Sequence, residues 1–454
     1  MRKYFGTDGI RRIANTELTP ELVYSVAKSG AYVLSKHAEH RPTILIGRDT
    51  RISGTLIESA MVAGFLSYGA NVKLLGVMPT PAVAYLTRKL NADASVVISA
   101  SHNTYEFNGI KYFSNKGMKI PDDLEEEIEQ VMESGKLQEL TAKNEKIGIS
   151  EYRTDLLDEY IYFFRKTFDD TMEKLVRDDF IVGIDTANGA TSVVAEKVFT
   201  SLGINHIILN NTPNGININE NCGSTHLENL KKVVKENKLS LGIAYDGDGD
   251  RCLAIDEKGN EIDGDKLLAI ISKNLNKKGK LKKDTIVATV MSNLGLNKYA
   301  KKEKLNLIQT KVGDRYVLEE MLKQGYNLGG EQSGHVIMLD YNPTGDGILT
   351  SLMLIQAILE ENKPASEISK IMKQYPQVLI NAKVNADKKY EYEKDKEIKK
   401  EIEELEKEFA GNGRVLIRPS GTEPLVRVMI EGENQKYITE KAKKLAKLIE
   451  IKLV

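Results

Sequence analysis

Several features that mark common protein classes are scarce or missing in this chain of 454 residues. Tryptophan is absent, and the only two cysteines, Cys222 and Cys252, form no CxxC pair. Two distant cysteines cannot build a disulfide framework, which favours a reducing compartment. No stretch reaches the roughly 18 apolar residues of a membrane span, and no apolar leader follows Met1. The sequence therefore predicts a soluble cytoplasmic protein with no membrane partner.

An excess of charge of one sign is also lacking. Lys and Arg total 64 and Asp and Glu total 65, so the net charge is -1. No overall field therefore favours nucleic acid as a partner, and an anionic ligand would need a local basic pocket. The chain is too long for a single hydrophobic core, which predicts several domains.

Strand and helix patterns alternate along most of the chain. Apolar runs at 44–46, 71–75 and 94–98 are separated by helical patterns, as in βαβ units. The alternation restarts near residue 180, where a helix is expected at 190–202, and again near residue 285. We predict an α/β protein: three related α/β domains with mixed sheets and a C-terminal α+β domain, arranged around a central cleft. The expected domain boundaries are 1–150, 151–252, 253–367 and 368–454.

A polar cluster interrupts the apolar pattern between Ser95 and Lys111. A short buried strand is expected first, and Ser101 follows on a loop, where open α/β sheets present reactive groups. Ser101 is thus a candidate nucleophile and Lys111 a candidate proton carrier. A plain turn is the alternative for this stretch alone. A serine hydrolase is disfavoured because no Gly-x-Ser-x-Gly occurs, and a metal site at His102 lacks a second ligand at suitable spacing.

Three aspartates alternate with glycine at Asp246, Asp248 and Asp250, between two apolar runs. Glycine lets the backbone curl so that the three carboxylates can converge on one hard cation. An EF-hand is excluded because Arg251 occupies the sixth position, which needs glycine, and because strands flank the loop. Mg²⁺ with incomplete protein ligation, leaving room for a phosphate oxygen, is preferred over a solvated acidic turn.

Two further polar segments suit a sugar phosphate. A strand is expected at 326–328, and the loop 329–335 that follows it contains a carboxylate, an amide, a hydroxyl and an imidazole. Such groups form hydrogen bonds with sugar hydroxyls, although a plain loop is the alternative. The segment 418–422 together with Arg427 offers guanidinium groups, hydroxyls and backbone amides for a phosphate. No Walker motif occurs, so a P-loop nucleotide site is not expected.

Taken together, these segments and the opening Phe5-Gly6-Thr7-Asp8-Gly9 resemble the α-D-phosphohexomutase family over the whole chain. Three features are similar to the branch that acts on glucosamine phosphates: Val312-Gly313-Asp314-Arg315, Gln332, and the run from Asn221 to His226. The resemblance implies an isomerase that interconverts glucosamine 6-phosphate and glucosamine 1-phosphate, a step toward UDP-N-acetylglucosamine.

The resemblance also implies a set of site residues. Ser101 would carry a phosphoryl group and, with Asp246, Asp248 and Asp250, would ligate one Mg²⁺ per chain, while glucosamine 1,6-bisphosphate would be the intermediate and activator. The remaining catalytic residues would be Lys111, His335, Arg11 and Arg251. The residues expected to bind the substrate are Asp314, Arg315, Glu331, Gln332, Ser333, Arg418, Ser420, Gly421, Thr422 and Arg427. A homodimer is a further expectation from the family.

Two positions depart from the family's pattern. Arg12 stands where a second glycine is usual and places a bulky charge beside the site. Thr104 stands where proline is common, and this change is expected to loosen the loop that carries Ser101. The alternative functions are a phosphomannomutase or phosphoglucomutase and a non-catalytic sugar-phosphate-binding protein. Simple binding would not require a nucleophile, so Ser101 argues against the binding protein.

Overall fold

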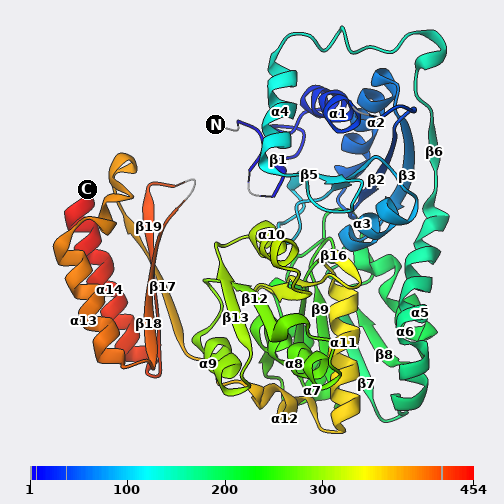
Figure 1. Ribbon diagram of the computed structural model, residues 1–454. Coiled ribbons are helices and arrows are strands. Elements are labelled where there is room, and N and C mark those ends of the chain that lie inside the picture. Colours follow the sequence, from blue (N-terminus) through cyan, green and yellow to red (C-terminus); the bar gives the residue numbers. More distant parts are fainter. Residues whose placement is uncertain (1–2, 7, 37, 421–422) are drawn as a thin grey trace. The chain divides into compact units, whose positions relative to one another are not determined.

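The structure is a computed structural model that describes residues 3–6, 8–36, 38–420 and 423–454. The chain divides into two compact units (Figure 1). Unit 1 comprises Met1–Met291 with Leu305–Ile371, and unit 2 comprises Ser292–Lys304 with Met372–Val454. No helix among the described residues is both long enough and apolar enough to cross a membrane.

Unit 1 contains three mixed sheets that share one topology. In each sheet three parallel strands come first, and each of the next two strands pairs antiparallel to the strand before it. The orders are β3-β2-β4-β5-β1, β8-β7-β9-β10-β11 and β13-β12-β14-β15-β16. The first sheet has one more strand, β6, beside β3. The predicted α/β class with three related domains is confirmed by these sheets.

The strands of the first sheet are β1 (Ile10–Ile13), β2 (Thr43–Arg48), β3 (Asn71–Val77), β4 (Ala94–Ile98), β5 (Phe107–Ser114) and β6 (Ser150–Tyr152). Those of the second are β7 (Ile181–Asp185), β8 (Asn205–Leu209), β9 (Leu241–Tyr245), β10 (Cys252–Asp256) and β11 (Glu261–Ile262). Those of the third are β12 (Thr285–Thr289), β13 (Asn306–Thr310), β14 (Leu328–Gly330), β15 (Val336–Met338) and β16 (Asn342–Gly345). The central strands β4, β9 and β12 are buried at every position, as expected where both faces of a sheet are covered.

Helices connect these strands and supply the rest of the core. Thr19 caps the first helix by accepting a hydrogen bond from the Leu22 amide, and Gly69 ends the second in the left-handed conformation at φ +107°. The helices of unit 1 are α1 (Pro20–Ser35), α2 (Gly54–Tyr68), α3 (Thr80–Lys89), α4 (Asp122–Glu133), α5 (Leu157–Leu175), α6 (Ala195–Ser201), α7 (Glu228–Glu236), α8 (Gly264–Lys277), α10 (Asp314–Gln324), α11 (Gly347–Glu361) and α12 (Ala365–Ile368).

Unit 2 contains the segment predicted to form the α+β domain, together with residues 292–304, which were expected in the third domain. Its antiparallel sheet has the order β17-β19-β18, and Val428, Ile430, Leu405, Leu445 and Ile449 from the sheet and two helices form its core. The elements of unit 2 are α9 (Leu294–Lys302), β17 (Gln377–Lys383), α13 (Lys396–Phe409), β18 (Gly413–Pro419), β19 (Leu425–Gly432) and α14 (Gln435–Leu453).

Two details of the predicted local structure were wrong. A strand was expected at 326–328 with the glycines after it, but β14 spans Leu328–Gly330, so both glycines lie inside the strand. A Cβ at Gly329 would come within 2.6 Å of Met321 Sδ, so glycine lets α10 pack closely on the strand. The helix expected at 190–202 is divided into a 3₁₀ turn and α6, because Val194 leaves the helical conformation at φ −131°.

Candidate active site

Three polar loops occupy the same place in the three sheets of unit 1. Each connects the third parallel strand to its antiparallel neighbour: residues 99–106 between β4 and β5, residues 246–251 between β9 and β10, and residues 331–335 between β14 and β15. We call them the nucleophile loop, the aspartate loop and the sugar loop. One repeated topology therefore delivers three different sets of side chains to one region.

The Ser101 side chain lies buried against the aspartate loop. Ser101 is 1% exposed, and its Oγ donates a hydrogen bond to Asp246 Oδ2 at 2.6 Å. Its backbone φ of +51° is in the left-handed region, where a residue other than glycine is strained. The neighbouring His102 ring has its pKa lowered to about 4 by burial and by Arg251 and Arg11, so it is neutral near pH 7.

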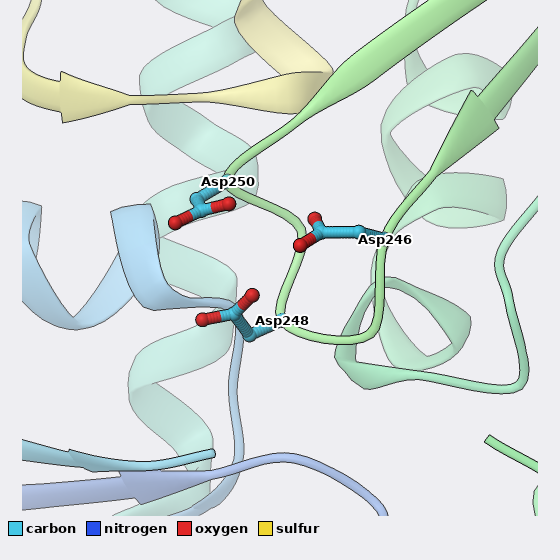
Figure 2. A group of neighbouring side chains, drawn as sticks. All are labelled: Asp246, Asp248 and Asp250. Carbon is cyan, nitrogen blue, oxygen red and sulfur yellow. The ribbon is translucent and has the colours of Figure 1, made fainter. Parts of the chain in front are cut away.

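Figure 2 shows the carboxylates of Asp246, Asp248 and Asp250 converging on one space. One oxygen of each lies within 4.8 Å of the others, and all three residues are buried. Asp248 Oδ1 and Asp250 Oδ1 have no hydrogen-bond partner within the described part of the chain. Burial and the two neighbouring aspartates raise the pKa of Asp246 well above its ordinary value. Crowded, under-bonded carboxylates of this kind fit a divalent cation with hard oxygen ligands, such as Mg²⁺.

Buried Lys111 in β5 and partly buried Lys119, which follows β5, pair with carboxylates. The Lys111 ammonium lies 2.9 Å from Asp248 and 3.2 Å from Asp8, and the Lys119 ammonium lies 2.5 Å from Asp8 and 2.6 Å from Asp314. Burial by itself would lower the pKa of Lys111, but Asp248 and Asp8 raise it above its ordinary value. Burial likewise opposes the charge of Lys119, whose pKa is raised by Asp314 and Asp8. Both side chains are therefore ammonium groups.

His335 lies between Asp314 and the aspartate loop. Its Nε2 lies 3.4 Å from Asp314 Oδ2, and its Nδ1 lies 3.5 Å from Asp250 Oδ2. The Gly345 amide donates to Nε2 at 3.0 Å, so a neutral ring carries its proton on Nδ1, facing Asp250. The result is a closed path of ionisable groups, which we call the charge path. Its members in order are Asp248, Lys111, Asp8, Lys119, Asp314, His335 and Asp250.

A cavity of about 590 Å³ opens beside the charge path, within the size range of small-molecule sites. The acidic and basic side chains that line it are Lys3, Asp8, Arg11, Arg12, His102, Lys119, Asp250, Arg251, Asp314, Glu331 and His335. Ser101, Lys111, Asp246 and Asp248 are at most 1% exposed and do not line it. The cavity is thus a polar, charged space next to a buried serine and a buried cluster of carboxylates.

Three arginines of the cavity wall are held by neighbouring groups. Arg11 pairs with Asp8 at 2.7 Å and donates to Asn103 Oδ1 at 3.1 Å, and Arg251 Nε lies 3.9 Å from Asp250. Arg12, the departure from the family pattern, donates to the Lys3 carbonyl at 2.9 Å. The bulky charge expected beside the site is therefore on the cavity wall.

Three residues of unit 1 that were expected to bind the substrate do not line this cavity. The Arg315 guanidinium contacts Asp122 and lies 3.0 Å from Glu125, at the start of α4. Gln332 donates to Asp263 at 3.2 Å, and Ser333 is exposed to solvent. A role for these three side chains in substrate binding stays a prediction.

The residues predicted to hold a phosphate, at 418–422 and Arg427, lie in unit 2. Arg418 and Arg427 are paired directly across β18 and β19, where like charges repel each other. Burial and the neighbouring Arg427 lower the pKa of Arg418. The Ser420 carbonyl accepts a hydrogen bond from Lys389 Nζ at 2.9 Å, which brings a third cation to this turn. Such a cluster suits an anion. Gly421 and Thr422 lie outside the described residues, as does Thr7 of the opening motif.

Asp8 and Lys119 are the two members of the charge path that the sequence analysis did not assign. Asp8 belongs to the opening motif that carried the family resemblance, so that motif was an available signal. Lys119 follows Gly117 and Met118 in an ordinary connecting segment, and no local pattern distinguishes it from the other lysines. Lys389 was likewise indistinguishable within a segment rich in Lys and Glu.

Comparison with protein families finds four matching domains along the chain. Domain descriptions of phosphoglucomutase/phosphomannomutase match in order: alpha/beta/alpha domain I at residues 2–139, domain II at 158–259, domain III at 263–375 and the C-terminal domain at 379–448. Two solved structures have the same fold. A phosphoglucomutase/phosphomannomutase family protein from Burkholderia thailandensis has a TM-score of 0.79 at 20% identity, covering 98% of this chain and 97% of that one. The Aspergillus fumigatus N-acetylphosphoglucosamine mutase, in complex with GlcNAc-6P and magnesium, has a TM-score of 0.69 at 16% identity, covering 100% and 96%.

Similarity in sequence is much higher to three proteins named phosphoglucosamine mutase. Those of Clostridium kluyveri and Clostridium botulinum are 54% and 55% identical over 454 residues, and that of Ruminiclostridium cellulolyticum is 52% identical over 453 residues. Each comparison covers 100% of both chains. These identities confirm the expected branch: the chain belongs to the phosphoglucosamine mutases, within the phosphoglucomutase/phosphomannomutase family.

Proposed function

We propose that this chain interconverts glucosamine 6-phosphate and glucosamine 1-phosphate and that Ser101 carries the transferred phosphoryl group. The observation that carries the proposal is the 2.6 Å hydrogen bond from Ser101 Oγ to Asp246, which holds a hydroxyl against a buried cluster of carboxylates. The choice of an amino sugar is supported by relatives of 52% to 55% identity. It is also supported by Asp314 and Glu331 on the cavity wall, since carboxylates attract a protonated amine.

Asp246, Asp248 and Asp250, together with the phosphorylated Ser101, would hold one Mg²⁺ per chain. When bound, this ion would neutralise charge on the phosphoryl group and polarise it for in-line transfer. The Aspergillus fumigatus relative, which was solved with magnesium, supports a metal in this family. Arg11 and Arg251, on the cavity wall, would compensate the remaining charge of the phosphoserine.

The reaction consists of two transfers through Ser101. In the first, the bond between phosphorus and Ser101 Oγ breaks and a bond from phosphorus to a sugar hydroxyl oxygen forms. That hydroxyl loses its proton, and Ser101 Oγ takes one up and becomes a hydroxyl again. The product is glucosamine 1,6-bisphosphate. After it turns over, its other phosphoryl group passes back to Ser101 Oγ, and the sugar oxygen that loses it takes up the proton. We assign the proton transfers to Lys111, which lies 2.9 Å from Asp248, with His335 assisting at the sugar. As an ammonium group, Lys111 would give a proton to the oxygen that phosphorus leaves. As the resulting amine, it would take the proton of the oxygen that phosphorus joins, so it ends each transfer as an ammonium group again.

The substrate would be held at both ends. Glu331 and Asp314 would bind the sugar from the cavity wall, and Arg315, Gln332 and Ser333 belong to the same proposed set. In unit 2, the phosphate that is not reacting would be held by Arg418, Ser420, Gly421, Thr422 and Arg427. Bidentate arginines suit such a phosphate in either orientation of the sugar. The homodimer and the cytoplasmic location stay predictions.

A coupled assay of the purified protein with Mg²⁺ and a trace of sugar 1,6-bisphosphate tests the proposal. Glucosamine 6-phosphate should be turned over with a much higher kcat/KM than glucose or mannose phosphates. A preference for a neutral hexose would keep the mechanism and change the substrate. No turnover of any of the three, with Ser101 shown to be phosphorylated by mass spectrometry, would favour a sugar-phosphate-binding protein instead.

A further inference from the structure

We infer that Arg51 and Asn219 are positioning residues that hold the backbone of the nucleophile loop, so that Ser101 Oγ stays directed at the aspartate loop. This inference rests on the proposed function, because it concerns the serine that would carry the phosphoryl group. Neither residue lines the cavity, so neither is assigned a contact with the reacting atoms.

The Arg51 guanidinium is buried under the nucleophile loop and binds three of its carbonyl groups. Arg51 is 1% exposed, and its Nη2 donates to the Ser101 carbonyl at 3.0 Å and to the Asn103 carbonyl at 2.8 Å. Its Nη1 donates to the carbonyl of Thr104. With the bond from its Nε to Asp49, the guanidinium makes four hydrogen bonds from three nitrogen atoms in one plane. A lysine ammonium has three donors on a single atom and could not reproduce this arrangement.

Asp49 orients Arg51 and also binds the other side of the Ser101 peptide. Asp49 Oδ2 accepts from Arg51 Nε at 2.9 Å and from Ser99 Oγ at 2.6 Å. Ser99 Oγ in turn accepts from the Ser101 amide at 2.9 Å. Both the amide and the carbonyl of Ser101 are thus tied to one buried ion pair at the end of β2.

Asn219 reaches the same carbonyls from the second sheet's side of unit 1. Its Nδ2 donates to the Ser101 carbonyl at 2.8 Å and to the Asn103 carbonyl at 2.9 Å. The Asn219 backbone is itself fixed, with φ +57° and its amide bonded to the Ala187 carbonyl at 2.9 Å. Asparagine tolerates this left-handed conformation better than most residues, which explains how a side chain amide is presented here.

The contacts of Arg51 and Asn219 restrain the backbone of the nucleophile loop, as a proline at position 104 would. Thr104 was expected to loosen the loop, but its carbonyl is bound by Arg51, and Ser101 is kept at a strained φ of +51°. A strained conformation persists only where its surroundings determine it. If the loop relaxed, Ser101 Oγ would lose its direction toward Asp246, and transfer from a nucleophile displaced by about 1 Å slows by about 100-fold.

The test compares Arg51→Lys and Asn219→Ala with two matched controls. Arg48→Lys alters a neighbouring arginine that pairs with Glu58, and Asn217→Ala alters an asparagine whose side chain bonds only within its own segment. Kinetics with glucosamine 6-phosphate, the fraction of Ser101 phosphorylated and hydrogen exchange of the 99–106 amides are measured for all four.

For Arg51→Lys and Asn219→Ala we expect kcat to fall by about 10- to 100-fold, with KM within about two-fold and with faster exchange in the nucleophile loop. The controls should keep their kcat and exchange rates. The inference is overturned if the folded variants keep wild-type kcat, if only KM changes, or if the controls fall equally. If Arg51→Lys does not fold, Asn219→Ala decides.

Hydrogen exchange separates this inference from the proposed function. Should the wild-type protein turn over no sugar phosphate, the proposed function fails, yet faster exchange at 99–106 in the two variants alone would still show that they hold the loop. Unchanged exchange would refute the positioning role whatever the activity.

Discussion

The nucleophile loop and the aspartate loop occupy the same position in two sheets of one topology, but they satisfy their polar groups in opposite ways. In the nucleophile loop, backbone carbonyls accept hydrogen bonds from buried side chains, and the Ser101 carbonyl accepts two. In the aspartate loop, Asp248 Oδ1 and Asp250 Oδ1 lack a hydrogen-bond partner among the described residues. A loop whose polar atoms are hydrogen-bonded within the protein holds a group in place. A loop with carboxylate oxygens that lack a partner can still bind a ligand.

The backbone of the aspartate loop is nevertheless well held. Gly249 adopts φ +72°, and its carbonyl accepts from the Gly347 amide at 3.0 Å at the start of α11. The Thr80 amide donates to the Asp248 carbonyl at 2.9 Å. The buried side-chain atoms of this loop that lack a hydrogen-bond partner among the described residues are two carboxylate oxygens and Arg251 Nε. Held backbone with unpartnered carboxylate oxygens is the arrangement expected of a preorganised cation site.

Removing the hydroxyl of the nucleophile loop should have the largest effect. Ser101→Ala is expected to lower mutase activity by about 10⁴-fold or more, since no other group can accept the phosphoryl, while Mg²⁺ and sugar phosphate still bind. A coupled assay and calorimetric titration measure the two properties, and Ser59→Ala on the surface of α2 serves as control. Unaltered turnover by Ser101→Ala would refute the phosphoserine mechanism.

Neutralising one carboxylate of the aspartate loop should be next in size. Asp250→Asn keeps the shape but removes a negative charge, so we expect Mg²⁺ affinity and activity each to fall by at least about 100-fold. Chelation of the metal from wild-type protein should give the same loss, reversed by added Mg²⁺. Activity of the chelated wild type equal to that of the metal-loaded enzyme would contradict the assignment.

Breaking the charge path at Lys119 should lower activity less than either of the two changes above. Lys119→Gln leaves Asp8 and Asp314 without the ammonium that lies between them, and we expect about a 10-fold loss of kcat together with a lower Tm. Lys116→Gln, an exposed position in the same connecting segment, is the matched control. Equal kinetics for the two variants would mean that Lys119 has no part in the reaction.

The smallest effect expected is one on stability alone, at Asp346, which caps the α11 helix that supports the aspartate loop. Burial raises the pKa of Asp346 to about 6, and an acid with a higher pKa in the folded protein binds more protons when folded. Its contribution to stability is therefore full below its unfolded pKa and is lost as pH rises toward 6.

Asp346→Asn removes this titration. The free energy of unfolding of wild type relative to the variant should decrease by about 2 kcal/mol between pH 4 and pH 7. Denaturant unfolding of both proteins across this range measures the change, and a constant difference would show that Asp346 titrates normally.

The local groups of the site could be predicted because their partners are close in sequence. Asp246, Asp248 and Asp250 lie within one loop with glycine between them, and strands flank them, so the spacing alone brings their oxygens together. The same holds for the loop position of Ser101 after a buried strand. The repeated alternation of strand and helix likewise predicted three related sheets, since the hydrophobic period depends on neighbouring residues.

The tertiary structure alone decided which distant side chains meet. Lys119 joins Asp8 to Asp314, and Arg51 reaches three carbonyls of the nucleophile loop, although nothing in their own segments marks them. Arg315, by contrast, follows Asp314 directly but pairs with Glu125 outside the cavity. Such contacts depend on how separate sheets and helices pack. Local periodicity determines the elements and their faces, but it does not specify which charged side chains those faces bring together.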